Sequence, residues 1–231
     1  MKLLLSFLFL LNTLAFSQSK NPDEILKGVI QNFDQVKDYV VDVSIKVDIQ
    51  SIKVPETKAK IYFKQPDKVH LEADGFAMLP KNGMQFSPVS LLKEDYTAIY
   101  NGEADLNGIN TSIIKVIPSG EKSEIILSTM WVDQKKKLIR KIEATTKMEG
   151  TFTIEFTYDG KIKYPLPSQI VFSFNLDKMN LPSGTQQNNS PFNHQPKHKM
   201  DSTTKGRVFV NYSNYIVNKG INDNMFEENK K

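Results

Sequence analysis

The sequence has no cysteine among its 231 residues, and this absence excludes several kinds of chemistry. Disulfides, a cysteine nucleophile and thiolate-bound metal sites are all impossible. A lipid anchor, which needs a cysteine at the processed N-terminus, is excluded as well. The chain must therefore stabilise its fold by burying apolar side chains, and it is long enough for a sizeable core.

Other parts of common active sites are also missing. The chain has three histidines, no Gly-x-Ser-x-Gly elbow, and neither of the glycine-rich phosphate-binding motifs. His194 and His198 are spaced like metal ligands on one helix face, but Pro196 lies between them and a zinc site needs more ligands. His70 alternates with apolar neighbours, so we expect it to face solvent. The sequence therefore favours a protein that is not an enzyme and that needs no metal or cofactor.

Arginine is scarce, since Arg140 and Arg207 are the only two. Aromatic residues are not interleaved with arginine, so nucleic-acid binding is not expected. The formal net charge is +4, and both signs are spread along the chain. The densest basic patch is Lys135–Lys137 with Arg140 and Lys141. A solvated turn is the favoured interpretation of this patch, and contact with an acidic partner or anionic headgroups is the alternative.

The N-terminus has the pattern of a secretory signal peptide. Lys2 precedes the apolar run Leu3–Leu11, and Ala15-Phe16-Ser17 is a small-x-small cleavage motif. We expect cleavage after Ser17, a single domain over residues 18–231, and a periplasmic location without a lipid anchor. No other stretch approaches the roughly 18 consecutive apolar residues of a membrane-spanning helix.

The first part of the mature chain predicts a helix followed by strands. Asn21 to Tyr39 has a capping residue, a proline in the first turn, and apolar residues at three- and four-residue spacing. Val40 to Ile52 alternates apolar and polar residues, which is typical of a strand with one buried face. Ala59 to Ala73 predicts a hairpin whose turn is Pro66-Asp67.

The rest of the chain predicts a succession of short strands separated by turn residues. We expect them at Tyr96–Tyr100, Thr111–Ile117, Ser123–Val132, Leu138–Met148, Thr151–Tyr158, Ser168–Leu176 and Arg207–Val217. Asp177 to Gly206 is rich in polar residues and predicts a long flexible loop, and Gly220 to Phe226 predicts a docked tail. The fold class is α+β and mainly β, a curved antiparallel half-barrel of about ten to eleven strands with an N-terminal helix.

Gly75 to Leu92 interrupts the alternation with apolar residues set among two prolines and two glycines. We expect either a loop that fills the core or a mobile lid over an apolar cavity on the concave face. The lid candidates are Phe76, Met78, Met84 and Phe86. The ligand-binding candidates of the cavity wall are Val43, Ile45, Val47, Ile61, Phe63, Leu71, Phe152, Phe156, Phe172 and Phe174. Ordinary core packing is the alternative for each of these residues.

Four short segments carry a resemblance to a known family: Tyr62–Lys68, Thr129–Asp133 with its basic turn, Tyr164–Pro167, and Tyr212–Asn218 leading to Phe226. Together with the helix and the long first strand, they resemble the LolA-like outer-membrane lipoprotein-sorting proteins. The resemblance implies an eleven-stranded half-open barrel over an apolar cavity, and a periplasmic carrier of lipoprotein acyl chains. In the family's carrier an arginine before the hairpin proline helps to fasten the closed lid. Gln65 stands at that position here, and it can hydrogen-bond to lid carbonyls without charge assistance.

Three hypotheses follow. The leading one is a monomeric periplasmic carrier for acylated ligands, chiefly lipoproteins in transit to the outer membrane, which can meet membrane-bound donor or acceptor proteins. The second is a regulatory or interaction module with the same fold and no cargo. The third is a hydrolase, which would need His70, a carboxylate and a hydroxyl in one cleft.

Overall fold

The structure is a computed structural model that describes residues 20–49, 52–73, 89–93, 95–120, 123–148, 150–175 and 205–227. The signal peptide, the four lid candidates and nearly all of the polar loop lie outside these residues, so those expectations stay predictions. The helices are α1 (Pro22–Phe33), η2 (Ser90–Leu92) and η4 (Asp223–Phe226). None of the helices in the described ranges is long and apolar enough to cross a membrane.

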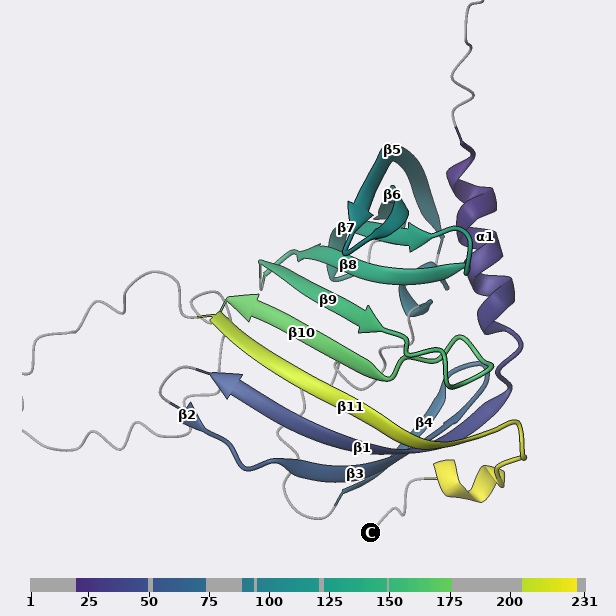
Figure 1. The fold of residues 1–231 in the computed structure, drawn as a ribbon, viewed down its shortest axis with the longest axis vertical. Helices are drawn as coiled ribbons and strands as arrows, with labels where there is room; N and C mark the ends of the chain where they lie inside the picture. Colours follow the sequence, from purple (N-terminus) through teal and green to yellow (C-terminus); the bar gives the residue numbers. More distant parts are fainter. Residues whose placement is uncertain are drawn as a thin grey trace, which may run out of the picture.

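Eleven strands make one antiparallel sheet. They are β1 (Asp38–Ile49), β2 (Ile52–Lys53), β3 (Thr57–Lys64), β4 (Lys68–Ala73), β5 (Tyr96–Leu106), β6 (Ile109–Pro118), β7 (Ile125–Asp133), β8 (Leu138–Thr146), β9 (Thr151–Thr157), β10 (Gln169–Asn175) and β11 (Lys205–Val217). The strand order is β4-β3-β1-β11-β10-β9-β8-β7-β6-β5, and β2 pairs with β1 alone. Among the described strands β4 and β5 do not pair with each other, so the sheet is an open half-barrel, as predicted (Figure 1).

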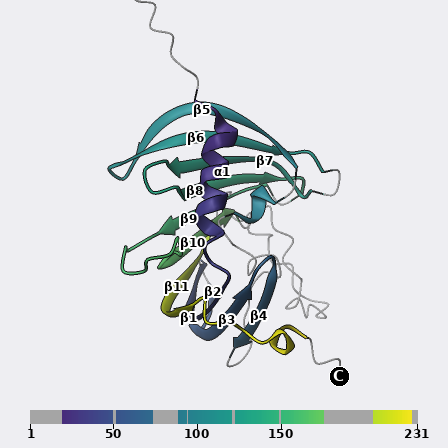
Figure 2. The same cartoon turned by 90° about the vertical axis from the view of Figure 1, so that its right-hand side faces the viewer.

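Helix α1 lies inside the arch of the curved sheet. Figure 2 shows it crossing in front of β5 to β9, and it packs against β5 and β8. Asn21 caps the helix by accepting a hydrogen bond from the Asp23 N–H at 3.0 Å. Its buried residues Leu26, Val29 and Phe33 follow the predicted stripe. We call the sheet face that α1 contacts the inner face, and the opposite face the outer face.

The predicted helix end at Tyr39 is wrong, because α1 ends at Phe33. The chain from Asp38 onward pairs with β3, where Asp38 lies opposite Lys64. Val36 keeps the helical spacing and is fully buried, so the apolar stripe continues although the helix does not. Strand pairing therefore overrides a local pattern that favoured helix.

Two strand boundaries also differ from the sequence expectation. β5 does not end at Tyr100 but continues to Leu106, because a β-bulge between Tyr100 and Glu103 absorbs the expected turn. The turn instead lies at Asn107-Gly108, where φ is 56° and 80°. β11 begins at Lys205, so the last two residues assigned to the polar loop belong to a strand.

The C-terminal tail docks beside the hairpin of β3 and β4, as predicted. The Lys64 and Lys68 ammonium groups each donate to Asp223 Oδ1, at 3.0 and 2.7 Å. Lys64 also donates to the Ile221 carbonyl at 2.9 Å, and the Phe226 ring lies 5.9 Å from the Lys68 ammonium. These contacts hold η4 against β4.

Candidate ligand-binding face

The inner face is apolar across nearly the whole width of the sheet. Residues that lie directly opposite each other on neighbouring strands share a face, so the strand register can be followed from edge to edge. One row runs through eight strands as Val47, Val208, Phe172, Ile154, Ile142, Met130, Ile114 and Tyr100. The neighbouring row is Ile49, Gly206, Phe174, Phe152, Ala144, Ser128, Val116 and Ala98. Such rows form a continuous apolar wall rather than separate core contacts.

All ten cavity-wall candidates from the sequence lie on this inner face. On the side of β4 the register joins Leu71 to Ile61 and Ile61 to Val41, and Phe63 lies opposite Tyr39. The candidates on β9 and β10 belong to the two rows above or, like Phe156, lie one pleat away. The structure thus brings together the residues that alternation selected from five separate strands. Their role in binding a ligand remains a prediction.

Two clusters of buried side chains divide the inner face. The first, cluster A, is centred on α1 and includes Leu26, Phe33, Met130 and Ile142. The second, cluster B, is built on Val41, Val43, Ile45, Ile61 and Val208, with partly buried neighbours that include Val47, Leu71 and Phe174. Every member of cluster B comes from a strand. Cluster A is therefore an ordinary helix-on-sheet core, whereas cluster B has no described helix among its members.

One glycine makes room for an aromatic ring on the inner face. A Cβ at Gly206 would lie 2.5 Å from Phe174 Cε2 and 3.3 Å from Ile49 Cγ1. The ring of Phe174 therefore lies across the bare backbone of β11, and Phe172 follows at a centroid distance of 5.3 Å. Phe174 and Phe172, both predicted wall residues, thus form an aromatic border of cluster B, and the role of Gly206 in making room for them was not anticipated from the sequence.

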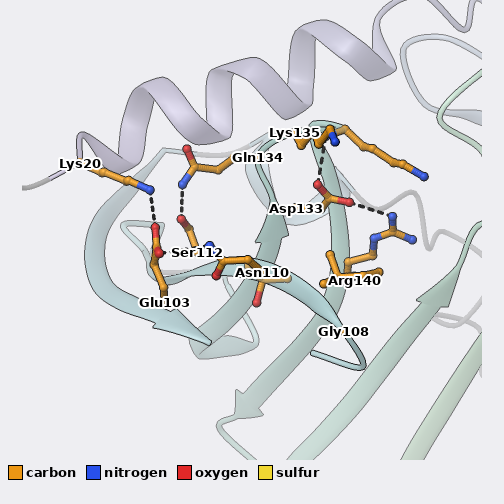
Figure 3. A pocket seen from close by; sticks show the side chains of 12 residues that line it. Lys20, Glu103, Gly108, Asn110, Ser112, Asp133, Gln134, Lys135 and Arg140 are labelled. Atoms are coloured by element: carbon orange, nitrogen blue, oxygen red, sulfur yellow. Dashed lines mark hydrogen bonds and ion pairs between the residues drawn. The ribbon is translucent and has the colours of Figure 1, made fainter. Parts of the chain in front are cut away.

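One cavity in the described part of the chain lies away from this apolar wall. It has a volume of about 490 Å³ and lies alongside α1, between Lys20 and the β5–β6 and β7–β8 turns (Figure 3). Lys20 forms an ion pair with Glu103, and hydrogen bonds from Lys20 and Asn110 hold the pKa of Glu103 below its usual value. Charged side chains such as Lys20, Glu103 and Arg140 contribute to its lining, which distinguishes this cavity from the wall of the inner face.

Beside this cavity Asp133 and Arg140 form an ion pair that sequence reasoning missed. Arg140 occupies the bulge between β7 and β8, and its guanidinium also lies 5.1 Å from the centre of the Tyr158 ring. The turn between the two residues carries Lys135–Lys137, whose side chains are exposed. Asn32 of α1 donates to the carbonyls of Lys136 and Lys137 at 3.1 Å. This contact ties the helix to the basic turn. The three lysines of the turn are solvated as the sequence suggested, whereas the expectation that Arg140 belongs to a solvated patch is wrong, because its guanidinium is buried against Asp133.

Gln65 and His70 lie apart from the apolar wall. Gln65 Nε2 donates to the Val36 carbonyl at 2.7 Å, so its side chain is engaged by the connection between α1 and β1. His70 lies on the outer face opposite Tyr62, with ring centroids 5.8 Å apart. No group of three potential metal ligands occurs in the described ranges.

Comparison with known proteins identifies the fold. No protein-family model matches the sequence, and no curated protein does. A LolA superfamily protein from Nitrosomonas europaea matches the structure with a TM-score of 0.57 at 12% identity, over 90% of this chain and 98% of that one. The chain has a LolA-like fold.

Two further structures agree with this assignment over the same shares of both chains. A domain described as an outer membrane lipoprotein-sorting protein domain, from Vibrio parahaemolyticus, gives a TM-score of 0.60 at 11% identity. A DUF1329 family protein from Desulfovibrio piger gives 0.55 at 14% identity. The LolA-like fold therefore extends over nearly all of the chain, as the resemblance in the sequence implied.

Proposed function

We propose that the protein is a periplasmic carrier or binding protein for acylated ligands, chiefly lipoproteins in transit to the outer membrane. The observation that carries this proposal is cluster B, an apolar wall built from strands alone within a LolA-like sheet. An acyl chain lying on it would gain roughly 0.8 kcal/mol for each buried methylene group. Binding of this kind needs no catalytic group, cofactor or metal.

The location and partners form part of the same proposal. The signal-peptide pattern over residues 1–17 supports export and cleavage after Ser17, and the absence of cysteine supports a mature chain without a lipid anchor. A monomer that receives and delivers an acylated ligand would meet donor and acceptor proteins at the two membranes.

A regulatory or interaction module without cargo is the second candidate. Gln65 favours it, because its side chain is already bonded to the Val36 carbonyl and carries no charge with which to fasten a lid. Such a module would use the same fold to bind a protein partner.

The decisive test is to purify the exported protein without detergent from a double-membraned bacterium, then extract and weigh bound lipid by mass spectrometry. A fluorescent probe with a sixteen-carbon acyl chain measures affinity directly. The carrier proposal expects acyl species in the extract and saturable binding of the probe. Recovery of a stable protein partner with no lipid and no probe binding would overturn it in favour of the module.

Phe172→Ala and Phe209→Ala provide a matched pair of variants. Phe172 lies on the inner face, whereas Phe209 lies opposite Lys46 on the outer face under the guanidinium of Arg207. Loss of one wall ring should weaken acyl binding about ten-fold, and Phe209→Ala should leave it unchanged. Equal effects of the two variants would contradict a binding site on the inner face.

A further inference from the structure

Three tyrosines meet where clusters A and B join. Tyr39 lies on β1, and Tyr212 and Tyr215 lie on β11; all three pack against both clusters. The Tyr215 ring stands between the other two, with centroids 5.7 Å from Tyr39 and 6.0 Å from Tyr212. Tyr39 also stacks on Phe63 at 5.0 Å. The apolar wall therefore contains one group of phenol rings, set between its helix-covered part and cluster B.

A β-bulge makes this grouping possible. Val40 lies opposite Ile216 and Asp42 opposite Ser213, so Asn214 and Tyr215 together face the single residue Val41. Asn214 takes a positive φ of 55°, a conformation that asparagine tolerates better than most residues. If the strand kept all its residues and had no bulge, strict alternation would turn Tyr215 to the opposite face from Tyr212. The bulge turns both rings inward.

The three hydroxyl groups differ in their partners. Tyr215 donates to the Pro167 carbonyl at 2.9 Å. Tyr39 and Tyr212 have no hydrogen-bond partner among the described residues. In the described ranges two side-chain atoms are fully buried without a hydrogen-bond partner, Ser128 Oγ and Arg140 Nε. The hydroxyl oxygens of Tyr39 and Tyr212 are not among them. Both tyrosines are only partly buried, so two hydroxyl donors without a partner among the described residues lie on a face that is otherwise apolar.

The surroundings keep these hydroxyls neutral. Burial raises the pKa of Tyr39, and burial together with the nearby Tyr39 raises that of Tyr212. Burial, followed by the neighbouring tyrosines and Asp159, raises the pKa of Tyr215 as well. No lysine or arginine of the described ranges is among the groups that shift the pKa values of these three tyrosines. Both free hydroxyls thus act as neutral donors, in a place that disfavours an anion.

We propose that the Tyr39 and Tyr212 hydroxyls bind the carbonyl oxygen at the head of an acyl chain, whose hydrocarbon then lies along cluster B. This inference rests on the proposed function and deepens it. A neutral ester or amide carbonyl fits the site better than a carboxylate, because no described lysine or arginine acts on these two hydroxyls and could pair with a charged head. The pair would fix the position of the chain, whereas the wall supplies most of the affinity.

The test compares three ligands with the same sixteen-carbon chain length: methyl palmitate, palmitate and hexadecane. Each displaces N-phenyl-1-naphthylamine, a neutral probe without a carbonyl, from wild type and from the double variant Tyr39→Phe with Tyr212→Phe. The proposal expects methyl palmitate to lose about ten-fold in affinity in the double variant, because two hydrogen bonds are removed. Hexadecane should bind both proteins equally, and palmitate should bind wild type more weakly than methyl palmitate does.

Tyr62→Phe is the control, because Tyr62 lies on the outer face and donates to Glu72 at 2.9 Å. A methyl palmitate labelled with ¹³C at the carbonyl adds a second readout, since its infrared stretch should shift to higher frequency in the double variant. If all ligands bind and the double variant changes neither readout, the inference fails and the carrier proposal stands. If wild type binds none of them, both fail.

Discussion

Asp133 Oδ2 lies 2.8 Å from Arg140 Nη2, and the two side chains keep only 5% and 8% of their surface exposed. Asp133 also accepts the Lys136 N–H at 3.0 Å through its other oxygen. One carboxylate thus closes the β7–β8 turn and neutralises a buried guanidinium.

Asp133→Asn should destabilise the protein by about 3–5 kcal/mol, because it leaves the charge of Arg140 buried without an anion. Urea unfolding followed by circular dichroism measures the change. Lys60→Gln is the control, since Lys60 lies 3.8 Å from Asp42 and both side chains are about half exposed. That variant should change stability by about 0–1 kcal/mol. Similar losses in the two variants would contradict the importance of burial.

Gly206→Ala should destabilise the protein by about 1–3 kcal/mol, because the new Cβ meets the Phe174 ring and the wall is overpacked. Adding Phe174→Leu should recover part of the loss, since the shorter side chain does not reach across β11. Thermal unfolding of the single and double variants measures this. Additive losses would show that the ring and the glycine are not coupled.

Gln65→Ala should cost about 1–3 kcal/mol, because the carbonyl of the fully buried Val36 loses its hydrogen bond. Gln35→Ala is the matched control, since the side chain of exposed Gln35 donates to the Asn32 side chain. Chemical denaturation compares the two variants. If Gln65→Ala proves as stable as Gln35→Ala, the role of Gln65 in holding the connection between α1 and β1 is refuted.

The docked tail should loosen in acid. Hydrogen bonds from Lys68 and Lys64 hold the pKa of Asp223 below its ordinary value of 3.8. Because the pKa of Asp223 is lower in the docked tail than in a free one, docking is favoured at pH values above the ordinary pKa. Docking is lost as the pH falls through the lower pKa of the docked state. The NMR shift of the Met225 amide, which donates to the Asn222 carbonyl, should report this change. In Asp223→Asn the Met225 amide should show, already at neutral pH, the chemical shift that the wild type reaches only in acid. A Met225 shift equal to that of the wild type at neutral pH would contradict the prediction.

The alternation of apolar and polar residues identified the residues of the inner face, because side chains of a regular strand point to its two faces in turn. Val43 and Ile61 could be assigned to the wall from the sequence for this reason, and the register bears out their shared face. The helix was predicted too long because the buried Val36 fits a helical stripe equally well. Only pairing with β3, which lies more than twenty residues further on, decides that the chain has already left the helix.

The tyrosine group was not visible in the sequence for a related reason. Counting by twos along β11 places Tyr212 and Tyr215 on opposite faces, and only a bulge reverses that assignment. The one available signal was Asn214, a residue that adopts positive φ more readily than most. The buried pair of Asp133 and Arg140 was equally hidden, because a charged residue beside a basic turn gives no sign of burial.

The bulge at Asn214 has a consequence for how such a wall can diverge. If β11 kept all of its residues but paired without the bulge, Asn214 would face inward opposite Val41 and Tyr215 would turn outward. Ile216, now about half exposed, would then turn inward. The number of polar groups offered to a ligand thus depends on the pairing register of β11 as well as on residue type. Homologues that pair this strand with and without the bulge should select different ligands while keeping the same tyrosines.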